Sequence, residues 1–215
     1  NEFIIFSDAM GISMLTITQD YQRPAHATEP TLIGPFHLED SPKFETGADI
    51  SAGAQGTPMY ARGRVLDLDG KPLADAVIDV WHSDDRGLYD VQEDLATKGP
   101  WARGTLTTGP DGGYSFWSVL PVDYPVPQDG TAVTMLRATT GRGWRPAHLH
   151  FRIQAPGQRE LVTHIFDRNS KNLDADAVFG VRPSLVGDFV RHEAGTAPDG
   201  REMKQPFYTL DYDFV

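Results

Sequence analysis

Two histidines separated by one residue are the feature of this sequence that indicates chemistry most directly. His148 and His150 lie in the run RPAHLHF, residues 145–151. Side chains alternate between the two faces of a β-strand, so both imidazoles would point the same way. Two imidazoles on one face supply half of a metal site. The pair alone leaves two interpretations open, a metal site and a chance arrangement on a surface strand.

A metal held by two imidazoles needs further donors, and the chain contains no cysteine. The remaining candidates are carboxylates, tyrosines and other histidines. Two tyrosines have unusual contexts: Tyr89 lies in a loop directly after a predicted strand, and Tyr124 lies among three prolines within residues 121–127. The alternative is that both tyrosines cap the core with their hydroxyls in water.

The elements that position these residues are predicted from periodicity and turn signals. Residues 2–19 have the apolar spacing of a helix, and residues 20–57, rich in proline, form an irregular connector. From Pro58 onward, β-rich runs alternate with turns, at Asp69-Gly70 and at residues 110–113, and each turn is expected to join a strand pair. The other expected elements are strands at 131–138, 147–154 and 161–166, a short helix at 174–179, and a tail at 207–214.

This pattern predicts a mainly β protein, an antiparallel β-sandwich domain of residues 58–215 preceded by a helical and linker segment of residues 1–57. The chain opens at Asn1 rather than at a methionine, so we expect the N-terminal helical segment to be truncated. A length of 215 residues, 40% of them hydrophobic, suits one sizeable core.

Charge and composition argue against several classes of partner. The net charge of −11 makes nucleic acid an unfavourable partner. No run of 18 apolar residues is present, so no membrane span is expected. The lack of cysteine and of a visible secretory signal favours a cytoplasmic location.

Four segments, GLYDVQ, PVDYPVPQDG, RPAHLHF and LVTHIF, occur in an order and at separations that resemble those of the intradiol ring-cleaving dioxygenases. The resemblance covers nearly the whole chain. It implies an enzyme that uses one non-haem Fe(III) per chain and O2 to split a catechol-type ring between its two hydroxyl-bearing carbons. In that family two tyrosinates and two histidines hold the iron, and the matching positions here are Tyr89, Tyr124, His148 and His150. Phenolates are hard anionic donors that suit a ferric ion, and the metal lowers their pKa.

The resemblance also implies further catalytic roles. Tyr124 would leave the metal and act as a general base, and Arg145 would stabilise negative charge on the substrate ring. His164 occupies the position where catechol-cleaving members usually carry glutamine, close to the metal. The residues implied to wall the substrate pocket are Ile5, Asp8, Leu32, Ile33, Gly34, Pro35, Phe36, Val126, Pro127 and Val178. The alternative for Asp8 is a place on the exposed face of its helix.

The segments GLYDVQ, THIF and DADAVFGV, together with Asp8, resemble relatives that act on hydroxyquinol, 1,2,4-trihydroxybenzene. The implied product is 3-hydroxy-cis,cis-muconate, or maleylacetate. The alternatives are a catechol or chlorocatechol 1,2-dioxygenase, a non-catalytic β-sandwich binding module, and a zinc hydrolase. The implied partners are a small aromatic diol or triol, O2, and a second copy of the chain in a homodimer formed through the N-terminal helices, which can hold a lipid between them.

Overall fold

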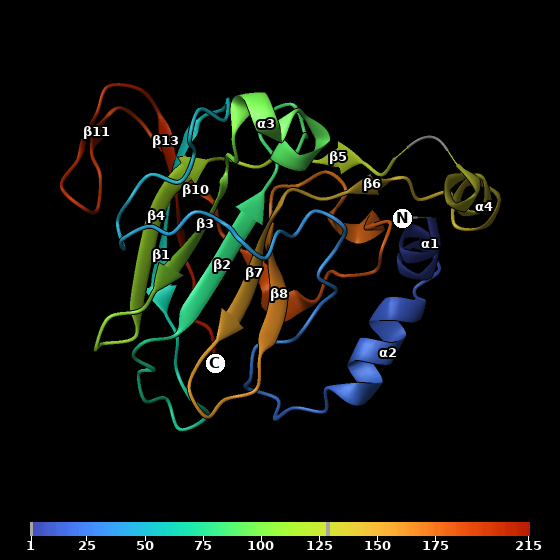
Figure 1. Ribbon diagram of the computed structural model, residues 1–215, viewed down its shortest axis with the longest axis horizontal. Coiled ribbons are helices and arrows are strands. Elements are labelled where there is room, and N and C mark those ends of the chain that lie inside the picture. The colour runs from blue at the N-terminus through green and yellow to red at the C-terminus, as the bar shows by residue number, and fades with distance from the viewer. Residues whose placement is uncertain (1, 128–129) are drawn as a thin grey trace.

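The computed structural model describes residues 2–127 and 130–215. Two β-sheets pack against each other, and helices α1, α2 and α4 lie beyond one edge of them (Figure 1). The core between the sheets draws on both: Ala61 and Phe116 come from one sheet, and Ile78, Leu149 and Ile165 come from the other. The predicted fold class, a mainly β sandwich with N-terminal helices, is therefore confirmed.

The first sheet has four strands in the order β10-β13-β1-β4. Only β1 and β13 are parallel, and the other neighbours run antiparallel. The strands are β1 (Pro58–Arg64), β4 (Gly113–Val119), β10 (Val190–His192) and β13 (Phe207–Asp211).

The second sheet has five strands in the order β3-β2-β7-β8-β9 and carries the histidines. Its neighbours are antiparallel except β8 and β9. The strands are β2 (Val77–His82), β3 (Arg103–Thr107), β7 (His148–Gln154), β8 (Leu161–Asp167) and β9 (Val186–Gly187).

Shorter elements connect the sheets. Two small ladders pair β5 with β6 and β11 with β12. These strands are β5 (Tyr124–Pro125), β6 (Trp144–Arg145), β11 (Gly195–Thr196) and β12 (Glu202–Met203). The helices are α1 (Glu2–Ala9), α2 (Ile12–Asp20), α3 (Leu95–Lys98) and α4 (Thr131–Thr139), with 3-10 turns η1 (Asp90–Gln92), η2 (Leu173–Ala175) and η3 (Pro183–Leu185).

Both predicted turns form, but the predicted strand pairs are wrong. The backbone amide of Asp67 donates to the carbonyl of Lys71 at 2.8 Å, which closes the turn that contains Asp69-Gly70. The strands on either side, β1 and β2, nevertheless lie in different sheets, and so do β3 and β4. Almost every residue of β2 is buried, so this strand needs a neighbour on both sides and obtains them from β3 and β7.

Residues 131–138 were expected to form a strand and instead form helix α4. Its buried residues are Ala132, Val133 and Leu136, which is the spacing of one helical face rather than of an alternating strand. The helix predicted at 174–179 is limited to the 3-10 turn η2.

The single helix predicted for residues 2–19 is divided into α1 and α2. Gly11 has a φ of 75° at the break, and a Cβ there would lie 3.2 Å from the ring of Phe179. Ala9 and Met14 then pack with Val133 of α4 in a second apolar cluster. No helix of the residues that the structure describes is both long enough and apolar enough to cross a membrane.

The linker before β1 contacts both sheets. Lys43 bridges to Thr105 of β3, Asp49 bridges to Trp117 of β4, and the Ile50 side chain is buried in the main core. Because the linker packs on both sheets, the division of the chain into residues 1–57 and 58–215 remains a proposal.

Candidate metal centre and substrate pocket

The register of β7 and β8 brings three histidines together. His150 pairs with His164, and His148 pairs with Phe166. The Nε2 atoms of His148 and His150 lie 3.0 Å apart, and the three imidazoles are almost fully buried. The alternation expected from their spacing therefore places both imidazoles of β7 on one face.

Two tyrosine hydroxyls complete a group of four donor atoms. Tyr89 Oη lies 3.1 Å from His150 Nε2, 3.4 Å from His148 Nε2 and 3.3 Å from Tyr124 Oη. Both tyrosines are buried, so neither caps the core with its hydroxyl in water. Two oxygen and two nitrogen donors thus face a common point.

The loop after β2 holds Tyr89 through buried charge and a close backbone approach. The carboxylate of Asp90, the next residue, accepts from Arg103 Nε at 2.6 Å, and both side chains are 1% exposed. Gly87 has a φ of 74°, and a Cβ there would lie 2.7 Å from the Cβ of Tyr124. The two tyrosines can approach each other because this position has no side chain.

Tyr124 is attached to the start of β7 by a short ladder. It pairs with Arg145 in the two-residue ladder of β5 and β6. The neighbouring Asp123 accepts from the amide of Ala147 at 2.8 Å and from the Ser170 hydroxyl at 2.6 Å.

Hydrogen bonds at the far nitrogen atoms orient the two imidazoles of β7. His148 Nδ1 lies 2.6 Å from the carbonyl oxygen of Pro146, which can only accept, so Nδ1 carries the proton and Nε2 keeps its lone pair. His150 Nδ1 lies 2.8 Å from His164 Nε2, and His164 Nδ1 lies 2.9 Å from the Thr31 hydroxyl. These contacts direct the Nε2 atoms of His148 and His150 toward the tyrosines.

Burial sets the protonation of the donors. It lowers the pKa of His148 and of His150 well below the usual range, helped by Arg145 and His164 respectively. Burial and the neighbouring Tyr124 raise the pKa of Tyr89 well above 10. The imidazoles are therefore in the neutral form that binds a metal, and a metal that bound the phenolates would release protons.

Arg145 brings a positive charge next to this group. Its Nε donates to Asp176 at 3.1 Å, and its NH1 lies 3.2 Å from His148 Nε2. Burial alone would lower the pKa of Arg145, but Asp176 and Tyr124 raise it above its usual value. The guanidinium thus stays charged inside the protein.

A small cavity of about 40 Å³ opens beside Tyr124 and Arg145. Eight of the ten predicted pocket residues line it, namely Ile5, Asp8, Leu32, Pro35, Phe36, Val126, Pro127 and Val178. The other two are placed differently, because Ile33 is 40% exposed and Gly34 lies against the His150 ring. Asp8 is buried rather than on an exposed helix face, and burial raises the pKa of its carboxyl.

Sequence reasoning did not identify several residues that support the site. Thr31 contacts His164, Asp176 holds Arg145, and the pair of Asp90 and Arg103 anchors the Tyr89 loop. Their partners are 133, 31 and 13 residues away in the chain, so only the DADAVFGV similarity pointed near one of them.

Comparison with known proteins adds a family to this geometry. A family model described as Dioxygenase matches residues 32–215. The 6-chlorohydroxyquinol 1,2-dioxygenase of Cupriavidus pinatubonensis is 48% identical over 214 residues, which is 100% of this chain and 73% of the relative. The chain belongs to the intradiol ring-cleaving dioxygenases. The hydroxyquinol 1,2-dioxygenase of Nocardioides simplex is also 48% identical, over 100% of this chain and 73% of the relative.

Solved structures of the same family share the fold of this dioxygenase. The hydroxyquinol 1,2-dioxygenase of Pseudomonas putida DLL-E4 matches with a TM-score of 0.88 at 39% identity, covering 99% of this chain and 74% of that one. The catechol 1,2-dioxygenase of Pseudomonas arvilla C-1 matches with a TM-score of 0.86 at 28% identity, covering 97% of this chain and 70% of that one.

Non-haem iron is typical of the intradiol dioxygenases, and the buried donors fit such an ion. His148, His150 and His164 form one grouping that could hold a metal. His164, however, faces the Nδ1 side of His150, away from the point toward which the two tyrosine hydroxyls turn. The set of two phenols and two imidazoles therefore fits one ion better than the three histidines do.

Proposed function

We propose that this dioxygenase cleaves hydroxyquinol with O2 between its adjacent hydroxyl-bearing carbons and yields 3-hydroxy-cis,cis-muconate. The observation that carries the proposal is the group of four buried donor atoms, with neighbouring separations of 3.0–3.4 Å. Such separations suit ligands of a single metal ion at about 2 Å. In this proposal, Tyr89, Tyr124, His148 and His150 hold one non-haem Fe(III) per chain.

The names of the relatives support the substrate. Hydroxyquinol or its chlorinated form appears in the names of the relatives that are 44–48% identical, whereas relatives named for catechol and chlorocatechol are 34% and 31% identical. Hydroxyquinol differs from catechol by one ring hydroxyl, so a polar group in the pocket should distinguish the two substrates.

Asp8 is the polar group of the pocket wall that suits this role. Its carboxyl lines the cavity among apolar side chains and is 6% exposed. A buried carboxyl that loses water gains most from a hydroxyl partner. We assign it to the third hydroxyl of hydroxyquinol.

Chelation of the substrate diol and activation of its ring toward O2 are the chemistry that the iron supplies when it is bound. Tyr124 takes one proton from the diol at its Oη. The charged Arg145, beside both Tyr124 and His148, stabilises negative charge that develops on the ring. His164 holds the Nδ1 side of His150, and Phe36, stacked 4.4 Å from the Tyr89 ring, excludes water.

The first test is the visible spectrum of the iron-loaded protein before and after anaerobic addition of hydroxyquinol. We expect a broad tyrosinate-to-Fe(III) band that moves to longer wavelength with substrate, because the diol binds the same ion. A protein that stays colourless after iron loading would contradict the proposed centre.

Asp8→Asn tests the substrate separately from the metal. We expect kcat/KM to fall about tenfold or more for hydroxyquinol and little for catechol, because only hydroxyquinol presents the third hydroxyl. Equal losses for both substrates would remove the assignment of Asp8 to the third hydroxyl and mean that its role is structural.

The assembly and location are further parts of the proposal. Phe3, Ile4, Ile12 and Leu15 of α1 and α2 are 50% or more exposed. Large apolar side chains gathered on two adjacent helices favour a protein or lipid contact. This supports a homodimer formed through the N-terminal helices, with lipid held between them. A cytoplasmic location is proposed separately, from the lack of cysteine.

A further inference from the structure

A second pocket, of about 230 Å³, lies at the other end of the strands that carry the histidines. Ile153 of β7 pairs with Leu161 of β8, and both line this pocket. His148 pairs with Phe166 at the opposite end of the same two strands. The second pocket shares no lining residue with the substrate pocket.

The wall of this pocket is mainly apolar. Leu161, Ile153 and Phe214 belong to the main core and line the pocket, and Leu73, which packs against that core, lines it as well. An engineered apolar cavity of about 150 Å³ holds a benzene molecule. The pocket therefore has room for an aromatic ring or a short acyl chain with a head group at the mouth.

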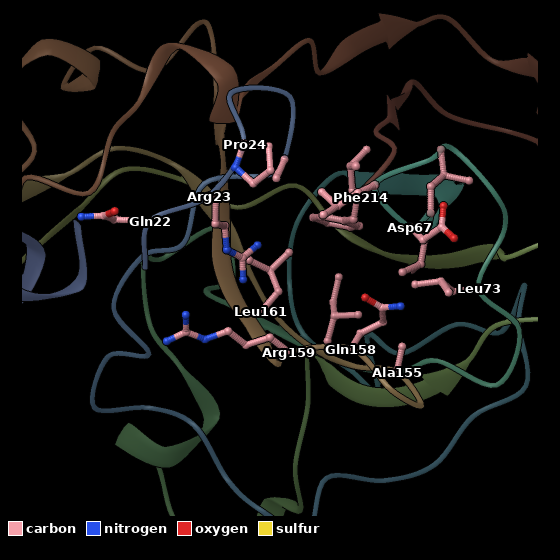
Figure 2. A pocket seen from close by; sticks show the side chains of 16 residues that line it. Gln22, Arg23, Pro24, Asp67, Leu73, Ala155, Gln158, Arg159, Leu161 and Phe214 are labelled. Carbon is pink, nitrogen blue, oxygen red and sulfur yellow. The ribbon is translucent and has the colours of Figure 1, made fainter. Parts of the chain in front are cut away.

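Two arginines stand together on one side of the pocket (Figure 2). The guanidinium of Arg159 lies 3.7 Å from the centre of the Tyr21 ring, and that of Arg23 lies 5.9 Å from it. One aromatic ring thus positions both cations. Burial and the nearby charge of Arg159 lower the pKa of Arg23.

No carboxylate in the part of the chain that the structure describes pairs with either arginine. Arg23 donates to the carbonyl oxygen of Thr28 at 3.0 Å. Glu160, the residue after Arg159, accepts instead from Arg152 at 3.0 Å. The arginine pair is consequently unneutralised at the edge of an apolar pocket.

Asp67 lies across the pocket from the arginines (Figure 2). Its Oδ1 accepts from the backbone amides of Asp69 and Lys71, each at 2.9 Å. The carboxylate of Asp67 therefore stabilises the backbone of the turn at residues 67–71.

We propose that the second pocket binds a carboxylate carried on a small apolar body. The carboxylate lies between Arg23 and Arg159, and the apolar part packs on Leu161 and Phe214. A guanidinium presents parallel N–H groups that match the two oxygens of a carboxylate. The site is separate from the iron centre and does not depend on the proposed reaction.

Isothermal titration calorimetry of the iron-loaded enzyme tests this site, with octanoate and benzoate as the two probes. A non-cleavable catechol analogue occupies the substrate pocket during the titration, so that neither acid can bind there. We expect one saturable site, with octanoate binding more tightly than octanol because octanol lacks the charge. The probe that binds more tightly shows whether the natural ligand is aliphatic or aromatic.

The double variant Arg23→Gln/Arg159→Gln should weaken binding about tenfold or more. The matched control is Arg168→Gln, which removes an exposed arginine that pairs with Asp188 elsewhere. An unchanged melting temperature confirms that the double variant is folded, and the single variant Arg159→Gln, at an exposed residue, repeats the test if it is not. Equal affinity in the charge variants and the wild type, equal affinity for octanol, or no saturable binding of either acid would overturn the proposal.

Discussion

His148, His150 and His164 stand on two long strands paired over most of their length, whereas Tyr89 and Tyr124 stand outside the main sheets. The positions of the histidines follow from strand register. The tyrosines depend on local contacts, an ion pair of the adjacent Asp90 for Tyr89 and a two-residue backbone ladder for Tyr124.

This contrast shows how one centre can combine two donors with fixed positions and one donor that can leave the metal. A register shift in β7 would move all its side chains to the other face, so the imidazoles cannot leave without disrupting the sheet. Tyr124 is held by a two-residue ladder with Arg145 and by the hydrogen bonds of the neighbouring Asp123, so fewer contacts must open for it to move than for an imidazole of β7. The proposed base therefore has less support from the sheets than either histidine of β7.

The largest effect on the iron centre is expected from His148→Ala, on strand β7. We expect loss of iron and of all activity, because a donor with a fixed position is removed and no neighbouring side chain replaces it. Iron content measured by mass spectrometry checks this. His192→Ala, on β10 in the other sheet, serves as the control and should keep full iron. Full occupancy in His148→Ala would exclude His148 from the ligand set.

Asp90→Ala removes the anchor of the loop that carries Tyr89. Breaking a buried ion pair costs about 3–5 kcal/mol of unfolding free energy, because Arg103 keeps its charge inside the protein. Urea denaturation measures the loss. Asp211→Ala breaks the exposed pair with Arg62 and should have a much smaller effect. Similar losses in both variants would mean that the Tyr89 loop is held by other contacts.

Tyr124→Phe removes only a hydroxyl from the releasable donor. We expect iron to remain on the other three donors while kcat falls roughly 100-fold, the usual contribution of a general base. Steady-state oxygen uptake together with iron analysis checks both points. Tyr114→Phe, which loses a hydroxyl bonded to the Tyr212 carbonyl, should leave kcat near wild type. Activity near wild type in Tyr124→Phe would show that Tyr124 is not the general base.

Thr31→Val is the mildest change and tests the outer support of His150. It removes the hydroxyl partner of His164 at nearly constant volume, and we expect about a tenfold loss of iron affinity. Competition with a chelator measures that affinity. Thr163→Val removes a similarly buried hydroxyl that bonds to the Glu29 carbonyl instead. Equal losses in the two variants would show that the effect is general packing.

The histidines and the strands that carry them could largely be predicted from sequence, because their spacing follows a local pattern. The spacing of His148 and His150 predicts one strand face, and β7 and β8 lie where the β-rich runs predicted them. Strand partners could not be predicted, since the turn at Asp69-Gly70 does not reveal that β2 pairs with β7 instead of β1. Residues 131–138 showed the same limit, because a β-rich composition outweighed the helical spacing of the three buried residues in α4.

The roles of Tyr89 and Tyr124 could be predicted only from the resemblance to the intradiol dioxygenases. No periodicity connects Tyr89 with Tyr124, which are 35 residues apart and meet through loops. The supports Thr31 and Asp176 depend on contacts across 133 and 31 residues, and neither residue type is unusual in its segment. Long-range contacts between irregular segments leave no local signal in a single sequence.

Gly87 has a consequence for how this centre can change over time. Its φ of 74° and the 2.7 Å approach to Tyr124 Cβ close the position to every other residue, including alanine. A single methyl group there would push the two oxygen donors apart without touching either of them. Mutations can change much of this loop during evolution, but position 87 is limited to glycine. The two tyrosine hydroxyls stay close together only while this position has no side chain.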